Sequence, residues 1–152
     1  MIAPPNTTSP NTTSPNTTSP DSMPLYPDPV INLESEPYWN AAKEGHLLLK
    51  RCASCGLTHY YPRALCPGCL SDQTQWIESQ GRGTIYSFSV MRRAPVPYAI
   101  AYVRLDEGVT MMTQLVDCDF NTLAIDQRVQ VQFRPTQGGY ALPVFTPTQA
   151  PA

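Results

Sequence analysis

The chain has 152 residues, with 12 acidic and 10 basic side chains and a formal net charge of −2. This balance excludes a strongly basic nucleic-acid-binding surface, because neutralising phosphates requires an excess of Lys and Arg. No stretch approaches the roughly 18 apolar residues of a membrane span, and the N-terminus lacks the basic and apolar regions of a signal peptide. We therefore expect a cytoplasmic protein that binds neither a membrane nor nucleic acid.

The first thirty residues are predicted to form a disordered arm. The sequence NTTSP occurs three times in residues 6–20, and the thirty residues include only two charges, Asp21 and Asp28. Such a segment cannot bury enough apolar surface to offset the entropy of ordering it. We expect the rest of the chain to form two modules, residues 31–80 and 81–147, followed by a short tail at 148–152.

A short amphipathic helix is predicted to follow Ser35, a plausible N-cap, and to end at Gly45. Tyr38 and Trp39 fall on one side of this helix. Packing against the chain's own core and docking on a partner both account for this aromatic edge, and Tyr38 and Trp39 are the candidate partner-binding residues.

Four of the five cysteines form two C-x-x-C pairs with ten residues between them: Cys52, Cys55, Cys66 and Cys69. Two such turns complete a tetrahedral shell of four sulfurs, which suits one zinc ion per chain. A single iron ion would use similar ligands, whereas a reducing compartment disfavours two disulfides. Because four thiolates leave no open position for water or substrate, we expect a structural metal. The fifth, Cys118, is predicted to be a core thiol.

The pattern around and beyond the cysteines is mostly β. Strands are expected at residues 46–51, 74–79, 84–91, 98–105, 109–118, 128–135 and 138–145. Alternation predicts that Tyr86, Phe88 and Phe133 point inward, and a short helical turn is expected at 120–125. The last five strands suit a small Greek-key barrel. The expected fold is thus mostly β: an N-terminal helix and a rubredoxin-like zinc ribbon, then a five-stranded OB-fold barrel.

The segment RRAPVPY is the one suggestive loop outside the cysteine cluster. It presents Arg92 and Arg93, then prolines, then Tyr98. These three residues are candidates for contact with a phosphate-bearing ligand or an acidic partner surface, although a solvated loop fits the pattern as well. No nucleophile–base pair accompanies them, so no catalytic residue is predicted.

The order EPYWNAAKEGHLLLKRCASCGLTHYYPRALCPGC, then WIESQGRGTIYSFSV, then YAIAYVRLDEG, resembles the zinc-ribbon OB-fold proteins catalogued as domain of unknown function thirty-five. The resemblance covers about residues 34–147. Two departures are visible: Leu70 after the last cysteine and Asp126 before the fourth barrel strand stand where glycine is common.

This resemblance implies a non-catalytic accessory subunit. Its relatives accompany thiolase-superfamily enzymes (thiolases, aldolases or acyltransferases) that act on acyl-CoA, while others join MaoC-type enoyl-CoA hydratases of steroid side-chain breakdown. Their barrel is thought to help bind or channel the acyl-CoA. The competing hypothesis is a single-stranded nucleic-acid-binding OB protein, whose barrel aromatics would stack on bases. An independent acyl-CoA hydrolase or transferase lacks a nucleophile–base pair.

Overall fold

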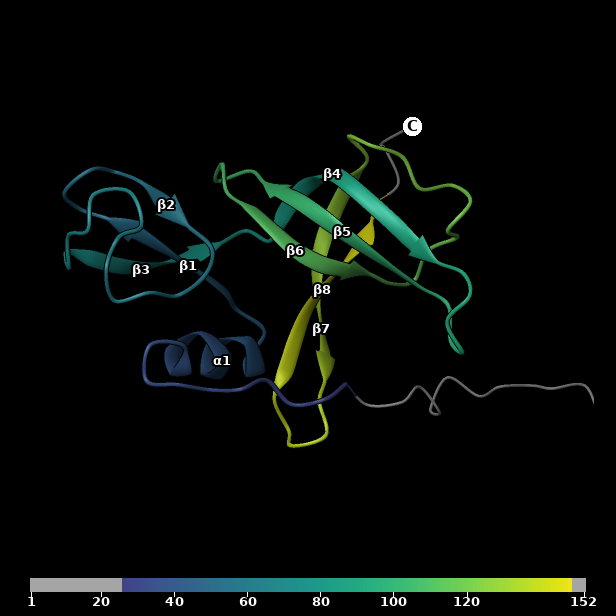
Figure 1. Cartoon of the computed structure of the whole chain (residues 1–152), viewed down its shortest axis with the longest axis horizontal. Helices are drawn as coiled ribbons and strands as arrows, with labels where there is room; N and C mark the ends of the chain where they lie inside the picture. Colours follow the sequence, from purple (N-terminus) through teal and green to yellow (C-terminus); the bar gives the residue numbers. More distant parts are fainter. Residues whose placement is uncertain (1–25, 149–152) are drawn as a thin grey trace, which may run out of the picture.

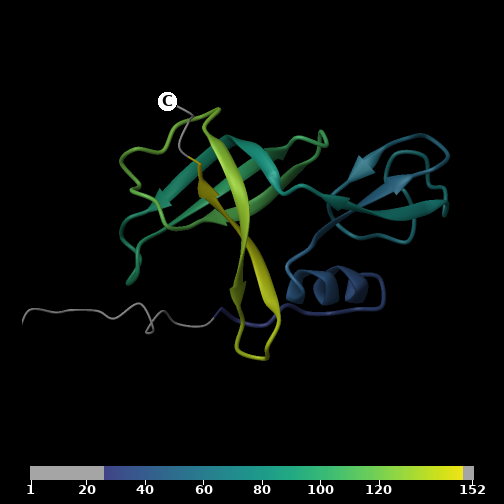
Figure 2. The ribbon, with the colours of Figure 1, turned by 180° about the vertical axis from the view of Figure 1, so that it is seen from behind.

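The computed structural model describes residues 26–148, so most of the expected arm and the end of the tail lie outside the described residues. A three-stranded sheet lies beside a closed barrel, and a helix lies beneath the sheet (Figures 1 and 2). The elements are α1 (Glu36–Lys43), β1 (Leu47–Cys52), β2 (Thr58–His59), β3 (Thr74–Ser79), β4 (Arg82–Met91), β5 (Tyr98–Leu105), β6 (Thr110–Leu115), β7 (Arg128–Pro135) and β8 (Ala141–Pro147).

Helix α1 begins and ends as the sequence predicts, but its N-terminal cap is different. Ser35 occupies the cap position without a capping bond from its side chain. Its hydroxyl instead accepts a bond from the Asn32 backbone N–H at 3.1 Å. At the other end, Gly45 has φ +88°, the left-handed conformation that commonly terminates a helix. One face of the helix buries Tyr38 and Ala42.

The barrel has strand order β4-β5-β6-β8-β7, and pairing of β4 with β7 closes it. All pairs are antiparallel except β6 with β8, which meet at Leu115 and Phe145. Five strands in this order form an OB-fold, and the mostly β fold is confirmed. Gly83 of β4 lies next to the backbone carbonyl of Arg104 in the paired strand β5. A side chain at position 83 would collide with this carbonyl.

Two details of the barrel differ from the prediction. The expected inward position of Tyr86 is wrong, because a bulge between Ile85 and Ser87 shifts the register and leaves Tyr86 exposed. The turn expected at residues 120–125 is not helical. The Asp119 side chain accepts a bond from the Asn121 N–H at 2.9 Å, and its carbonyl accepts one from Thr122, so the loop forms hydrogen-bonded turns instead.

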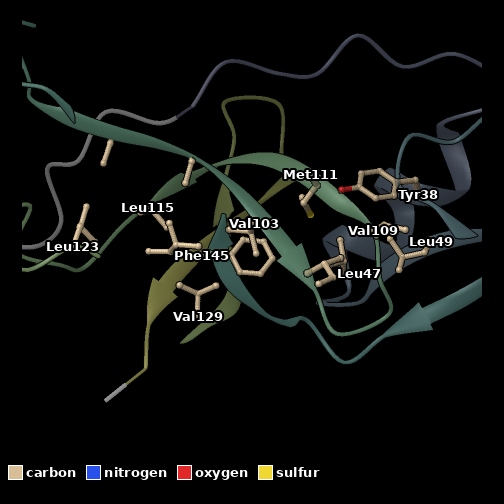
Figure 3. Packing of buried hydrophobic residues seen from close by; sticks show 14 residues of the cluster. Tyr38, Leu47, Leu49, Val103, Val109, Met111, Leu115, Leu123, Val129 and Phe145 are labelled. Carbon is tan, nitrogen blue, oxygen red and sulfur yellow. The ribbon is translucent and has the colours of Figure 1, made fainter. Parts of the chain in front are cut away.

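The helix, the three-stranded sheet and the barrel share one hydrophobic core. Tyr38 from α1 and Leu47 and Leu49 from β1 belong to the same buried cluster as the barrel residues Met111 and Phe145 (Figure 3). Burying such side chains stabilises a fold by roughly 1.5–3 kcal/mol each. The cysteine-bearing sheet is therefore held to the barrel by apolar packing as well as by the chain that connects them.

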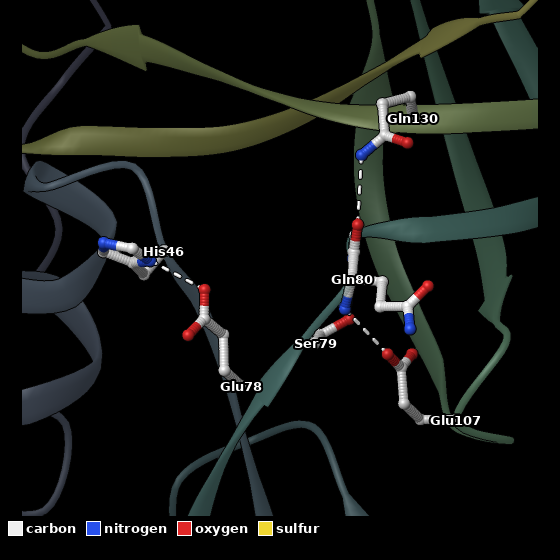
Figure 4. A network of polar contacts seen from close by, with 7 residues as sticks. His46, Glu78, Ser79, Gln80, Glu107 and Gln130 are labelled. Carbon is white, nitrogen blue, oxygen red and sulfur yellow. Dashed lines mark hydrogen bonds and ion pairs between the residues drawn. The ribbon is translucent and has the colours of Figure 1, made fainter.

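Polar contacts fix the connection between β3 and β4 (Figure 4). The Gln80 backbone N–H donates to Glu107 Oε1 at 2.8 Å, and Gln130 Nε2 donates to the Gln80 carbonyl at 3.1 Å. Val131 N–H donates to the Gly81 carbonyl at 2.7 Å. The link thus lies against the barrel on both sides, which sets the orientation of the sheet relative to it.

The described part of the N-terminal segment makes specific contacts with the turn between β7 and β8. Tyr26 forms a β-bridge with Thr136, and its carbonyl accepts a bond from the Gln137 N–H at 3.0 Å. Asp28 Oδ1 accepts bonds from the Thr136 hydroxyl and the Gly138 N–H, both at 2.6 Å. The expectation of an unpacked arm therefore does not hold for Tyr26 and Asp28.

These contacts predict a pH-dependent contribution to stability. Hydrogen bonds from Thr136 and then Gly138 hold the pKa of Asp28 below its ordinary value. A carboxyl with a lowered pKa in the folded state stabilises it fully above the unfolded pKa of about 3.9, and this contribution is lost as the pH falls through the folded pKa. We expect Asp28→Asn to lower the Tm at pH 7 and to leave it close to the wild-type value near pH 2.

Thermal unfolding at the two pH values checks this prediction. Thr136→Ser, which keeps the donor hydroxyl, is the matched control and should behave as wild type. A Tm difference between wild type and Asp28→Asn that is the same at both pH values would contradict the assignment.

Candidate metal centre and its surroundings

The four predicted ligands come together at one end of the three-stranded sheet. The sulfurs of Cys52, Cys55, Cys66 and Cys69 all lie within 4.8 Å of one another. Cys52 Sγ is 3.6 Å from Cys69 Sγ, and Cys55 Sγ is 3.6 Å from Cys66 Sγ. Zinc–sulfur bonds of about 2.3 Å in a tetrahedron place the ligand sulfurs about 3.8 Å apart. The cysteines are free rather than disulfide-bonded, and they are positioned to bind a metal ion.

Two similar turns deliver these sulfurs. In the first, the Gly56 N–H donates to the Cys52 carbonyl, and in the second the Leu70 N–H donates to the Cys66 carbonyl, both at 2.9 Å. The Gly68 N–H points at Cys66 Sγ from 3.4 Å. Backbone donors of this kind stabilise a thiolate without an additional charged residue.

The thiols influence one another's protonation. N–H groups of Cys55 and Ser54 lower the pKa of Cys52 to about 6. The N–H of Ser71 favours the thiolate of Cys69, but the neighbouring sulfur of Cys55, burial and the other cysteines outweigh it and raise its pKa. Four thiolates at these distances repel one another, and a cation among them removes the repulsion. This donor set therefore fits a divalent metal.

The two sequence departures fall at left-handed backbone positions. Leu70, which matches Gly56 in the first turn, has φ +62°, and Asp126 has φ +63°. The left-handed conformation costs a residue with a side chain roughly 1–2 kcal/mol. Both turns thus keep the left-handed conformation that favours glycine, although glycine is absent. The Leu70 side chain is exposed, so its burial does not offset the steric cost.

His59 lies between the two cysteine pairs in the sequence. It is buried, and its Nδ1 lies 2.9 Å from the Tyr61 carbonyl oxygen. Its place in β2, a strand of two residues, gave no recognisable sequence pattern.

Cys118 lies outside the cysteine cluster and packs against the core, and burial raises the pKa of its thiol.

The candidate ligand-binding residues lie at one end of the barrel. Arg92 and Arg93 are exposed between β4 and β5, and Arg92 Nη2 donates to Asn121 Oδ1 at 3.0 Å. Tyr98 lines a cavity of about 220 Å³ together with Tyr26 and Cys118. Tyr98 therefore lies at a cavity, whereas Arg92 is already hydrogen-bonded to Asn121 in the loop before β7.

The two candidate partner-binding residues differ in how far they are exposed to solvent. Tyr38 is only 2% exposed and contacts the Trp39 and Tyr60 rings edge-on, so it is unavailable to a partner. Trp39 is half-buried against the same core.

Sequence reasoning missed an apolar group on the outward side of β5 and β6. Ile100, Tyr102 and Met112 lie there beside two hollows. The sequence carried a signal for this group. Side chains alternate between the two faces of a strand, so the pattern that buries the neighbours of these residues also places them on the outside.

Comparison with known proteins supports both halves of this architecture. Residues 39–75 match the ChsH2 rubredoxin-like zinc ribbon domain, and residues 76–134 match the ChsH2 C-terminal OB-fold domain. A DUF35 domain-containing scaffold protein of Methanocaldococcus jannaschii is 34% identical over 104 residues, which are 63% of this chain and 74% of that protein. The chain belongs to the DUF35 family.

Two further relatives of this DUF35 chain carry enzyme names. A structure titled "Ltp2-ChsH2(DUF35) aldolase" holds a chain that is 32% identical, with a TM-score of 0.72 over 79% of this chain and 98% of that one. A probable enoyl-CoA hydratase alpha subunit of Thermomonospora curvata is 33% identical over 128 residues. That match covers 81% of the DUF35 chain but only 40% of the hydratase subunit.

Among residues 26–148 of the DUF35 chain, no helix has the length and apolar character needed to cross a membrane.

The metal centre predicts a specific loss on cysteine substitution. We expect one zinc per chain in the wild type and loss of the metal with unfolding of the ribbon in Cys66→Ser, because structural zinc supplies on the order of 10–16 kcal/mol of apparent binding free energy. Elemental analysis in reducing buffer and thermal unfolding measure both effects. Cys118→Ser is the control and should keep its zinc. A metal-free wild type of normal stability would contradict the assignment.

The left-handed turn predicts a stabilising substitution. Leu70→Gly should raise the free energy of unfolding by about 1 kcal/mol, because glycine adopts this conformation without a steric penalty. Chemical denaturation of the zinc-loaded protein measures the change. Leu57→Gly, which removes an exposed leucine from a nearby position without a positive φ, is the control and should not stabilise the protein.

Proposed function

We propose that the chain is a non-catalytic, zinc-binding subunit that assembles with a thiolase-superfamily enzyme acting on acyl-CoA. The observation that carries this proposal is the match to the ChsH2 chain of the Ltp2 aldolase structure, which extends over both the ribbon and the barrel. The name of the Methanocaldococcus relative, a scaffold protein, agrees with a subunit that positions other proteins. Steroid or lipid breakdown is the metabolic setting that the family resemblance favours.

In this proposal the metal is one structural zinc. Its ligands would be Cys52, Cys55, Cys66 and Cys69, whose four sulfurs complete a tetrahedral shell. Thiolate ligands require reducing conditions, so a cytoplasmic location belongs to the same proposal.

The acidic residues of the barrel support a non-catalytic role. Asp106 forms a bidentate ion pair with Arg128 at 2.8 Å, which lowers the pKa of Asp106. The Glu107 carboxylate accepts a hydrogen bond from the Gln80 backbone N–H. These adjacent acids hold the fold together, whereas a general acid–base pair would have to reach a substrate.

A MaoC-type enoyl-CoA hydratase is the second candidate partner. The Thermomonospora relative favours it, since that longer protein carries the name of a probable enoyl-CoA hydratase alpha subunit. Both candidates share an acyl-CoA ligand, for which Arg92, Arg93 and Tyr98 are the proposed contacts. Tyr98 is exposed and lines the cavity, and Arg93 is exposed in the loop that precedes Tyr98. Guanidinium groups bind phosphate strongly.

The test is co-expression with the thiolase-superfamily and MaoC-type enzymes of the same organism. We expect the zinc-loaded chain alone to turn over no acyl-CoA ester, and the two proteins to co-elute as a complex with acyl-CoA activity. Assays with and without the chain measure its contribution. An enzyme that is equally active without the chain and never co-elutes with it would show that the accessory role is wrong.

The same assay tests the ligand contacts. Arg93→Ala should raise the KM for acyl-CoA without impairing assembly, and Arg82→Ala, an exposed arginine at the start of β4, is the matched control. An unchanged KM in Arg93→Ala would remove this loop from the proposal and leave the subunit role intact.

A further inference from the structure

We infer that the outward face of β5 and β6 is the surface on which the partner enzyme docks. This inference rests on the proposed function and names the part of the chain that performs the assembly. We define the docking face by six residues of neighbouring strands: Ser87, Ser89, Ile100, Tyr102, Met112 and Gln114.

Strand pairing brings these side chains together. Tyr102 lies opposite Met112, and Ile100 lies opposite Gln114, in the antiparallel pairing of β5 with β6. On the other side of β5, Ser87 lies opposite Tyr102 and Ser89 opposite Ile100. Residues in such pairs share one face of a sheet. Two large apolar side chains remain in solvent there, with Tyr102 48% exposed and Met112 60% exposed.

Two hollows flank the ridge formed by Ile100 and Met112. One, of about 150 Å³, lies toward Ser87 and Ser89 of β4. The other, of about 230 Å³, lies toward β8 and is also lined by Tyr60 of the ribbon. Small serine side chains beside large apolar ones create the first hollow. The surface is thus shaped to receive protruding groups on both sides of a ridge.

The size of the hollows favours protein side chains over a small ligand. Sites for cofactors and drug-sized molecules have volumes of about 300–1,000 Å³ and enclose most of the ligand. Each hollow here is smaller than that range and is open to solvent. A hollow of this size accommodates a single side chain, which is how a protein partner anchors itself.

The charge of the face selects the kind of partner. Neither hollow is lined by an acidic or a basic residue. The nearest charge along β5 is Arg104, whose guanidinium lies 4.8 Å from the centre of the Tyr86 ring. A nucleic acid would require cations along its phosphates, which this face does not provide. An uncharged apolar patch on a protein is the complementary occupant.

The composition agrees with that occupant. The centres of protein–protein interfaces are rich in aromatic residues and Met and poor in charge, and a polar rim surrounds them. Tyr102, Ile100 and Met112 provide such a centre, with Gln114 and Arg104 at the rim. Both strands lie within residues 76–134, which match the ChsH2 C-terminal OB-fold domain.

The experiment measures the affinity of the zinc-loaded chain for its co-expressed thiolase-superfamily enzyme. We expect Met112→Asp to raise the Kd at least tenfold, because it buries an unpaired charge in the interface. Ile125→Asp is the matched control, since Ile125 is 61% exposed in the loop before β7, and its Kd should stay within twofold of wild type. Tyr102→Ser should also weaken binding, whereas Tyr61→Ser, at the 54% exposed Tyr61 of the ribbon, should not.

Each outcome bears on the inference. Met112→Asp and Tyr102→Ser that bind as tightly as wild type, with wild-type Tm values, would overturn the docking face and leave the proposed function standing. A wild-type chain that binds no such enzyme would overturn both.

Two other occupants are tested on the chain alone. Sedimentation would reveal a homodimer that Met112→Asp dissociates, and fluorescence anisotropy with a labelled oligo-dT at low salt would reveal binding that Tyr102→Ser abolishes. Either result would replace the enzyme as the occupant of this face.

Discussion

Packing of Tyr38, Leu47 and Leu49 against the barrel is the contact on which the rest of the structure depends. The three-stranded sheet is too small to enclose a core of its own, and its inner face is covered only because the barrel and α1 meet it there. Gln80 and Gly81 then orient the two parts through backbone bonds to Glu107 and the start of β7. The ribbon and the barrel therefore behave as one body with a shared interior.

The four cysteines of the candidate metal centre lie at the opposite end of that sheet. Apolar packing stabilises the end of β1 near Leu47, while Cys52 at its other end carries one of the four sulfurs. The long connection between β2 and β3 has little apolar surface to bury, so a metal that joined both C-x-x-C turns would supply the order that packing does not. This division of labour is typical of small domains with limited cores.

The same architecture agrees with the proposed role as a subunit. The adjacent acids Asp106 and Glu107 are engaged in holding strands and the connecting segment, and the sulfurs suit a closed metal shell. Among the exposed features of the described residues are an uncharged sheet face and a loop with Arg93. Both features are the ones that the proposed assembly with an acyl-CoA enzyme would use.

The sequence by itself determined which four cysteines come together, the number of barrel strands and the position of α1. These features depend on local spacing and alternation, which the chain carries residue by residue. Only the tertiary structure decided the features that depend on contacts between distant segments. A bulge after Ile85 turned Tyr86 outward, the core took Tyr38 away from the surface, and the turn after β7 ordered Asp28. The docking face arises in the same way, because pairing of β4, β5 and β6 brings together side chains that alternation alone places only on the outside.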